Sequence, residues 1–209
     1  MSRNQIVVIS LVAIVAAAAG ALLARGMLGN SSVPQAAMTA GTVLDPPRAL
    51  PTFSLIDQDN QPVTNASLNG RWTLLFFGFT NCPDVCPATL TQLAQLKKKL
   101  ADLRENERPH VVLITADPER DTPEQLRTYV KFFDPSFAGF TGSPADVERF
   151  TRELGVPVAI SKTSEGAYTV DHSAAIFLID RDAKFRALFS TPHDINKIAA
   201  DYRLIVEHG

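Results

Sequence analysis

Two thiols stand close together in this chain, and they are the only cysteines among its 209 residues. Cys82 and Cys86 belong to the segment 79–87, which reads Phe-Thr-Asn-Cys-Pro-Asp-Val-Cys-Pro. Thiols at this spacing can work as a redox-active disulfide, or they can bind a soft metal ion. A purely structural disulfide is the weaker alternative, because closing so short a loop stabilises a chain relatively little.

A metal ion at this pair needs a further ligand. Structural zinc takes four ligands, whereas copper(I) accepts a few soft ones, often two thiolates and an imidazole. The chain offers two sulfurs and four histidines, so a closed zinc site is not expected. The sulfur pair alone leaves disulfide chemistry and copper binding both open.

His172 is the best candidate for a third ligand. It stands just before the apolar run Ala174–Ile179, which should form a strand, so we expect it in a loop at the sheet edge facing the cysteine segment. The alternative is that His172 is only a polar residue that closes this loop. The other histidines are expected on the surface: His110, His193 and His208.

The prolines of the cysteine segment are expected to stiffen it. Pro83 and Pro87 restrict the backbone, which lowers the entropy lost when an ion is captured. Pro87 also fits the start of a helix. Cys86 would then face the positive end of the helix dipole, which favours a thiolate.

The pattern of apolar residues predicts an α/β fold around this site. The run from Trp72 to Phe77 is continuously apolar, apart from one threonine, as in a strand covered on both faces. Leucines at spacings of three and four from Leu90 to Leu103 predict an amphipathic helix. The other expected elements are a hairpin over 53–63, strands over 111–114, 174–179 and 184–189, and helices over 123–133, 144–154 and 194–207. Their order predicts a three-layer sandwich with a mixed central sheet, with the cysteine segment at the carboxyl end of a strand.

The N-terminal part of the chain is expected to be separate from this fold. Residues 6–24 carry no charge and are numerous enough to cross a bilayer as a helix. Arg3 precedes this run and Arg25 follows it, which favours a cytoplasmic N-terminus and an exported body. We predict a membrane anchor over 1–27, a linker over 28–50 and a folded domain over 51–209. A cleaved signal peptide is the alternative.

The composition agrees with a packed domain and gives no sign of nucleic-acid binding. Hydrophobic residues make up 45% of the chain, and the formal net charge is −2. A nucleic-acid-binding protein usually carries a basic excess, which this chain lacks.

Three segments resemble the SCO/SenC family of copper-binding cytochrome c oxidase assembly proteins. They are Gly78–Pro87, Asp117–Pro123 and Asp171–Ser173, and the resemblance runs in order from about Pro51 to Tyr202. It implies a thioredoxin-like domain, anchored by a single transmembrane helix in the inner membrane and facing the periplasm or an equivalent compartment.

The resemblance also implies a role. Copper would bind through Cys82, Cys86 and His172, and the protein would deliver copper to, or prepare, the dinuclear copper centre of cytochrome c oxidase. The implied partners are the copper-bearing oxidase subunit and other copper chaperones or thiol reductants. Such a protein is an assembly factor rather than an enzyme.

Two other functions fit the same cysteines. A thiol-disulfide oxidoreductase that reduces the cysteines of the oxidase copper site would need only the sulfur pair. A peroxide-reducing enzyme would need a threonine three residues before its reactive cysteine, and here Phe79 and Pro83 occupy those positions.

Overall fold

The computed structural model describes Gln5, Gly20, residues 35–162 and residues 168–208. The predicted membrane anchor over 1–27 and the first part of the predicted linker lie outside the described residues, apart from Gln5 and Gly20. Among the described residues, no helix is both long enough and apolar enough to cross a bilayer. The described residues between 35 and 207 form one compact unit, which contains all the described strands.

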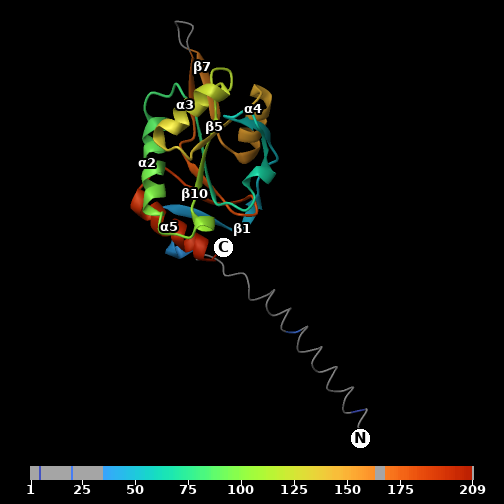
Figure 1. The fold of residues 1–209 in the computed structure, drawn as a ribbon, viewed down its shortest axis with the longest axis vertical. Coiled ribbons are helices and arrows are strands. Elements are labelled where there is room, and N and C mark those ends of the chain that lie inside the picture. Colours follow the sequence, from blue (N-terminus) through green and yellow to red (C-terminus); the bar gives the residue numbers. More distant parts are fainter. Residues whose placement is uncertain (1–4, 6–19, 21–34, 163–167, 209) are drawn as a thin grey trace. The chain divides into compact units, whose positions relative to one another are not determined.

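A mixed sheet of eight strands runs through this unit (Figure 1). Its three central strands β4, β5 and β6 are parallel, and the strands on both sides of them are antiparallel. The predicted mixed sheet is therefore confirmed. The strands lie in the order β1 (Gly41–Ala49), β10 (Lys184–Phe189), β9 (Ile176–Ile179), β4 (Thr73–Gly78), β5 (His110–Thr115), β6 (Ala138–Thr141), β2 (Ser54–Asp57) and β3 (Pro62–Thr64). A separate hairpin pairs β7 (Val158–Lys162) with β8 (Tyr168–His172).

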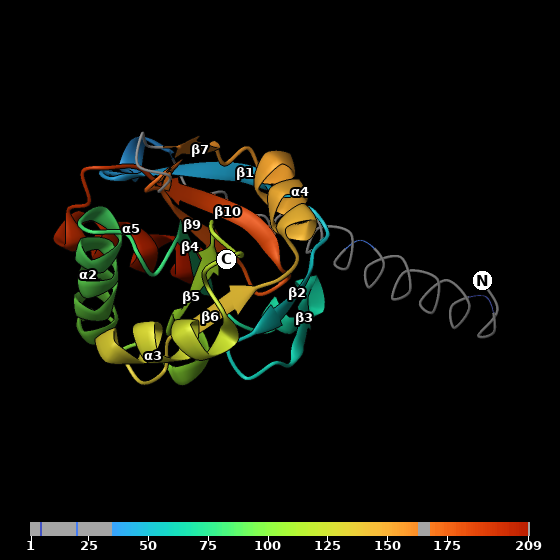
Figure 2. The ribbon, with the colours of Figure 1, turned by 90° about the horizontal axis from the view of Figure 1, so that it is seen from above.

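Helices cover both faces of the sheet, as the three-layer prediction requires (Figure 2). Helices α2 (Val85–Lys99), α3 (Pro123–Phe133) and α5 (Ile195–His208) pack on one face, and α4 (Pro144–Leu154) packs on the other. Alternate residues of β4 point to opposite faces, so Phe76 joins the core under α2 and Phe77 joins the core under α4. All six residues of β4 are buried, which explains its continuous apolar sequence.

Two helices begin where their capping residues predict, and one of them also ends there. Thr122 caps α3 by accepting a hydrogen bond from the Gln125 amide, and the Gln125 side chain accepts one from the Thr122 amide in return. Ser143 caps α4, and Gly155 ends it with a φ of 81°, a conformation that favours glycine. Helix α2 begins at Val85, two residues before the predicted start at Pro87.

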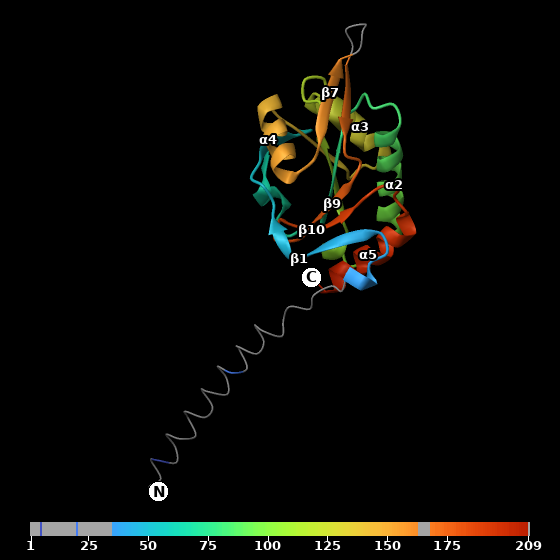
Figure 3. The same cartoon turned by 180° about the vertical axis from the view of Figure 1, so that it is seen from behind.

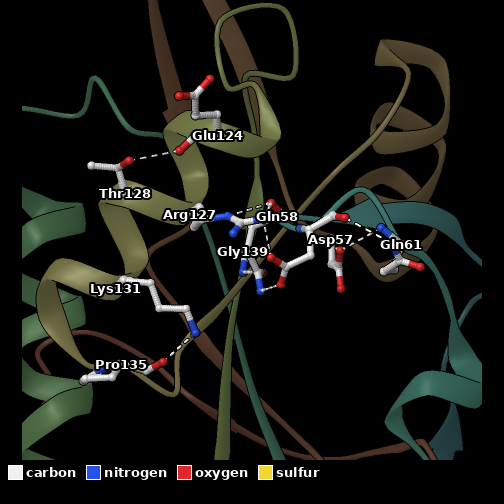
Figure 4. Close-up of polar contacts among 10 residues, drawn as sticks. Asp57, Gln58, Gln61, Glu124, Arg127, Thr128, Lys131, Pro135 and Gly139 are labelled. Atoms are coloured by element: carbon white, nitrogen blue, oxygen red, sulfur yellow. Dashed lines mark hydrogen bonds and ion pairs between the residues drawn. The ribbon is translucent and has the colours of Figure 1, made fainter.

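Helix α3 is fastened to the turn between β2 and β3 (Figure 4). Gln58, which is 7% exposed, accepts a hydrogen bond from Arg127 with its backbone carbonyl and one from the amide of Gly139 with its side chain. Figure 4 shows Arg127 reaching from α3 toward this turn, while Lys131 bonds the carbonyl of Pro135 further along. The Arg127 contact holds one flank of α3 against the β2–β3 turn.

The segment predicted as a linker over 28–50 is largely part of the domain. Gly41–Ala49 form the edge strand β1, which pairs with β10, and Gln35–Ala37 form a short 3-10 helix. The linker prediction is therefore wrong for these residues. Pro46 and Pro47 suggested a loop, but they lie where the register of β1 shifts, between Val43 and Arg48. Proline is tolerated at such irregular positions of an edge strand.

A buried carboxylate holds the start of β1 against α5. Asp201 is 2% exposed and accepts hydrogen bonds from the amides of Thr39, Ala40 and Gly41, at 3.0, 2.7 and 2.8 Å. Its partners are about 160 residues away in the sequence, so no local pattern predicts them. This contact joins the first part of the domain to its last helix.

We expect the substitution Asp201→Asn to destabilise the protein by about 1–3 kcal/mol, because an amide cannot accept all the hydrogen bonds that the carboxylate accepts. Urea unfolding measures the loss. Asp182→Asn is the control, because the Asp182 side chain is 76% exposed in a surface turn and should contribute little. Equal stabilities of the two variants would contradict this role of Asp201.

Candidate metal centre

The cysteines lie where β4 ends and α2 begins. Cys82 is half-buried in the connecting loop, and Cys86 is fully buried in the first turn of α2. Gly78, the last residue of β4, allows this close approach: a Cβ atom there would lie 3.0 Å from the Cys86 sulfur. The strand end therefore forms the floor beneath the buried thiol.

His172 reaches the cysteines from the other part of the chain. It is the last residue of β8, where it pairs with Val158 of β7, rather than a loop residue as expected. Figures 1 and 3 show this hairpin and the loop into α2 at the same end of the sheet. The Nε2 atom of His172 lies 3.3 Å from the Cys86 sulfur.

The ring of His172 is oriented so that one nitrogen faces the sulfurs. Its Nδ1 atom lies 3.0 Å from the carbonyl oxygen of Ser173, which can only accept, so Nδ1 carries the proton. Nε2 of the neutral ring therefore presents its lone pair to the sulfurs. The rings of Phe76 and Phe79 meet the imidazole edge-on, at centroid distances of 6.0 and 5.8 Å.

The two sulfurs and the imidazole nitrogen can share one ion. The three donor atoms all lie within 4.8 Å of one another. Metal–sulfur bonds of about 2.3 Å in a trigonal plane require donors about 4 Å apart, so small movements suffice. Within residues 35–162 and 168–208, this is the only group of three or more His, Cys, Asp or Glu side chains with such geometry.

The electrostatics of the pair differ from the expectation. Burial raises the pKa of Cys86 above its usual value, and the hydrogen bond with Cys82 raises it further. The α2 amide of Cys86 points to the Cys82 sulfur, 3.4 Å away, so the helix start contacts Cys82. The helix dipole was expected to favour a thiolate at Cys86, but burial shifts the pKa of this thiol in the opposite direction.

Asp121 anchors the loop that carries Cys82, a role that the sequence did not reveal. Its buried carboxylate accepts hydrogen bonds from the Thr80 hydroxyl and the Thr115 hydroxyl, both at 2.6 Å, and from the Thr80 amide at 3.1 Å. Burial raises the pKa of Asp121, whereas these hydrogen bonds lower it. In the sequence, residues 117–123 stood out only as a segment that resembles the SCO/SenC family.

The other histidines do not belong to this group. His110 is exposed at the start of β5, where it pairs with Thr73 at the start of β4 and so lies at the far end of that strand. His193 is half-buried rather than a simple surface residue, and burial lowers its pKa. His208 is the last residue of α5.

Comparison with known proteins gives a consistent result. The SCO1/SenC family profile matches residues 42–207. A putative copper-binding protein of Stutzerimonas stutzeri is 43% identical over 146 residues, which cover 69% of this chain and 71% of that protein. The chain belongs to the SCO1/SenC family. The resemblance drawn from the three sequence segments is thereby confirmed.

Solved Sco structures share the fold. Copper-bound ScoI of Arabidopsis thaliana has a TM-score of 0.69 at 35% identity, covering 76% of this chain and 96% of that one. BsSco, for which a disulfide switch is described, belongs to the Sco family of cytochrome c oxidase assembly proteins. It has a TM-score of 0.60 at 27% identity, covering 77% of this chain and 95% of that one. The predicted thioredoxin-like fold agrees with these neighbours.

The chain spans less than half the length of one longer relative. It aligns with 43% of the mitochondrial SCO1 homolog 1 of Arabidopsis thaliana, at 39% identity over 148 residues, or 70% of this chain.

We expect Asp121→Asn to loosen the cysteine loop. The variant leaves some of the Thr80 and Thr115 donors without an acceptor, so it should lose about 1–3 kcal/mol of stability. Amide hydrogen exchange at residues 79–82 should accelerate. Asp201→Asn is the matched control, because it removes a buried carboxylate elsewhere and should leave exchange in this loop unchanged. Equal exchange in both variants would contradict the anchoring role.

Proposed function

We propose that this chain binds copper through Cys82, Cys86 and His172 and transfers it to the copper-bearing subunit of cytochrome c oxidase. The observation that carries the proposal is the 3.3 Å distance between His172 Nε2 and the Cys86 sulfur. Together with the Cys82 sulfur, these two atoms form a triangle of donors, here called the donor triangle. The copper-bound Sco relatives support the choice of metal, and the oxidase assembly role described for BsSco supports the target.

The donor set suits copper as a cargo. Two thiolates and an imidazole are soft or intermediate ligands, which favour copper(I) over hard cations. Three donors also satisfy copper(I) without the fourth ligand that structural zinc requires. Because Cys82 is half-buried and Cys86 is fully buried, a ligand of the target is expected to replace Cys82 first and Cys86 last.

The proposed location follows from the sequence. Residues 1–27 would anchor the protein in the inner membrane by a single helix, and the domain would face the periplasm or an equivalent compartment. There, other copper chaperones or thiol reductants would supply the metal and keep the cysteines reduced. The domain would begin near residue 33, so the proposed linker is shorter than 28–50.

We expect His172→Ala to weaken copper(I) binding at least about 100-fold, since removing even an outer contact of a metal ligand costs about 10- to 100-fold. Anaerobic titration of the reduced protein against a competing copper chelator measures the affinity. His110→Ala is the control, because this exposed histidine lies at the other end of its strand. Unchanged affinity in His172→Ala would overturn the proposed ligand set.

A second function, thiol-disulfide exchange, is favoured by the unequal burial of the two sulfurs. The thiolate of half-buried Cys82 would attack one sulfur of a target disulfide, releasing the other as a thiolate and forming a mixed disulfide. The thiolate of Cys86 would then attack the Cys82 sulfur and release the second target thiol. The target gains two electrons, and this chain ends with a Cys82–Cys86 disulfide.

The two functions differ in their use of His172. We expect His172→Ala to leave the attack of Cys82 on a disulfide peptide unchanged within about threefold, because attack depends on the access and thiolate character of Cys82. Cys86→Ser should instead trap the mixed disulfide, which non-reducing gels and mass spectrometry detect. Failure of wild-type protein to form any mixed disulfide would remove this second function.

A further inference from the structure

The β7–β8 hairpin has an open edge beside the metal centre. In the part of the chain that the structure describes, β7 pairs with β8 and with no other strand. Figure 3 shows β7 between β8 and helix α4, so its unpaired edge lies on the α4 side. A two-stranded hairpin is only marginally stable by itself, and an unpaired edge can accept a strand from another chain.

The hydrogen bonds of the hairpin identify the groups on this edge. The Ser173 amide donates to the Pro157 carbonyl at 3.3 Å, and these two residues flank the pair Val158 and His172. Val158 and His172 therefore form a non-hydrogen-bonded pair, in which the N–H and C=O of Val158 point away from β8. The alternation along a strand gives the backbone groups of Ile160 the same direction. The open edge thus presents the backbone donors and acceptors of Val158 and Ile160.

A cavity of about 850 Å³ lies where this edge begins. Its walls come from the residues that follow β5, from one side of α4 and from the residues that lead into β7. Most of the lining side chains are apolar, among them Ala116, Pro118, Val147, Val156 and Val158. A strand that is added to an open edge gains affinity from main-chain hydrogen bonds and specificity from pockets that hold its alternate side chains. The open edge and the cavity together fit an extended peptide segment.

The rim of the cavity carries an acidic group without a counter-charge. Asp117 is 2% exposed and pairs with Arg120, and Glu148 pairs with Arg152 at 3.1 Å. Glu119 is exposed and also lines the cavity, but it forms no ion pair with any residue that the structure describes. The unbalanced charge of the rim is therefore negative, which complements a basic side chain on the bound segment.

We propose that β7 is the docking edge for the protein that accepts copper, which adds an extended segment as a third strand beside β7. One apolar side chain of that segment enters the cavity, and a basic side chain near it pairs with Glu119. This inference rests on the proposed function, because it assigns the surface that holds the copper acceptor.

The position of the edge suits transfer from the donor triangle. Paired strands lie about 4.8 Å apart, so the added strand would lie about 10 Å from β8, which ends at His172. About three extended residues span that distance. The copper ligands of the acceptor can therefore follow the docked segment directly in its sequence.

The amides of β7 give the most direct test. The probe is the soluble copper-bearing domain of the oxidase subunit, metal-free and reduced, added to the metal-free and reduced full-length protein. We expect amide hydrogen exchange at Val158 and Ile160 to slow at least about tenfold in the complex, because these amides gain partners in the third strand. Exchange at Ala159 should change less, since its amide faces Asp171 of β8 in both states. Unchanged exchange at Val158 and Ile160 in the complex would overturn the proposal, as would the absence of any complex.

Two substitutions test the edge and the charge separately. Ile160→Pro removes an N–H that points outward, where an edge strand tolerates proline, and it should weaken acceptor binding about tenfold or more. Glu119→Lys reverses the charge at the rim and should slow association about tenfold at low salt. Glu153→Lys is the matched control, because Glu153 is exposed on α4 but does not line the cavity. Equal association rates of the two lysine variants would contradict the proposed role of the rim.

Copper binding separates a failure of this proposal from a failure of the proposed function. Ile160→Pro and Glu119→Lys should keep the copper(I) affinity within about threefold of wild type, because neither substitution changes a donor residue. Where Ile160→Pro disturbs the hairpin and lowers this affinity, Glu119→Lys alone decides the test. Wild-type protein that binds no copper would remove the proposed function. Wild-type protein that binds copper, with acceptor binding unaltered in both variants, would remove only the docking edge.

Discussion

The contact between the Cys86 sulfur and the His172 ring joins segments that are 86 residues apart, and the donor triangle depends on it. The sheet imposes this contact. β4 and β9 are antiparallel, with Phe76 opposite Ile176, so the end of β4 and the start of β9 share one edge. Bringing the three donors together costs conformational entropy. The packing of the whole sheet therefore offsets this cost, rather than the binding of the ion. A centre formed in this way can accept and release a metal ion without unfolding.

Burial makes the charge on the Cys86 sulfur depend on whether a cation or a base is present. Cys86 is fully buried, and its raised pKa keeps its thiol neutral until a cation or a base removes the proton. The buried carboxylate of Asp121 acts in the same direction while it holds the loop through Thr80. A soft cation directly offsets the cost of burying a negatively charged sulfur, because it replaces the proton on that sulfur. The same burial leaves Cys82 as the sulfur through which a partner gains access.

The sequence predicted those features that depend on neighbours along the chain. The caps of α3 and α4, the apolar strand β4 and the paired cysteines all have local signals. It did not predict features set by distant contacts. The carboxylate that anchors Thr80 is 41 residues away, and the one that holds β1 is about 160 residues away. Strands β1 and β6 and the hairpin of β7 and β8 were missed for the same reason, since strands without a strong apolar pattern of their own are stabilised mainly by their partners. The burial of Cys86 likewise follows from packing on Gly78 rather than from its place in a helix.

The proposed copper binding and the proposed thiol exchange both depend on the two sulfurs, but they differ at His172. The Ser173 carbonyl fixes the proton of His172 on Nδ1, which leaves the Nε2 lone pair 3.3 Å from the Cys86 sulfur. In the proposed copper site this lone pair is the third donor, whereas the proposed thiol exchange needs only Cys82 and Cys86. A disulfide has no thiolate left for the metal. The two proposed chemistries therefore exclude each other in time, because both use Cys82 and Cys86. Under this proposal, the one that proceeds is decided by whether a metal ion or an oxidised partner reaches the half-buried Cys82 first.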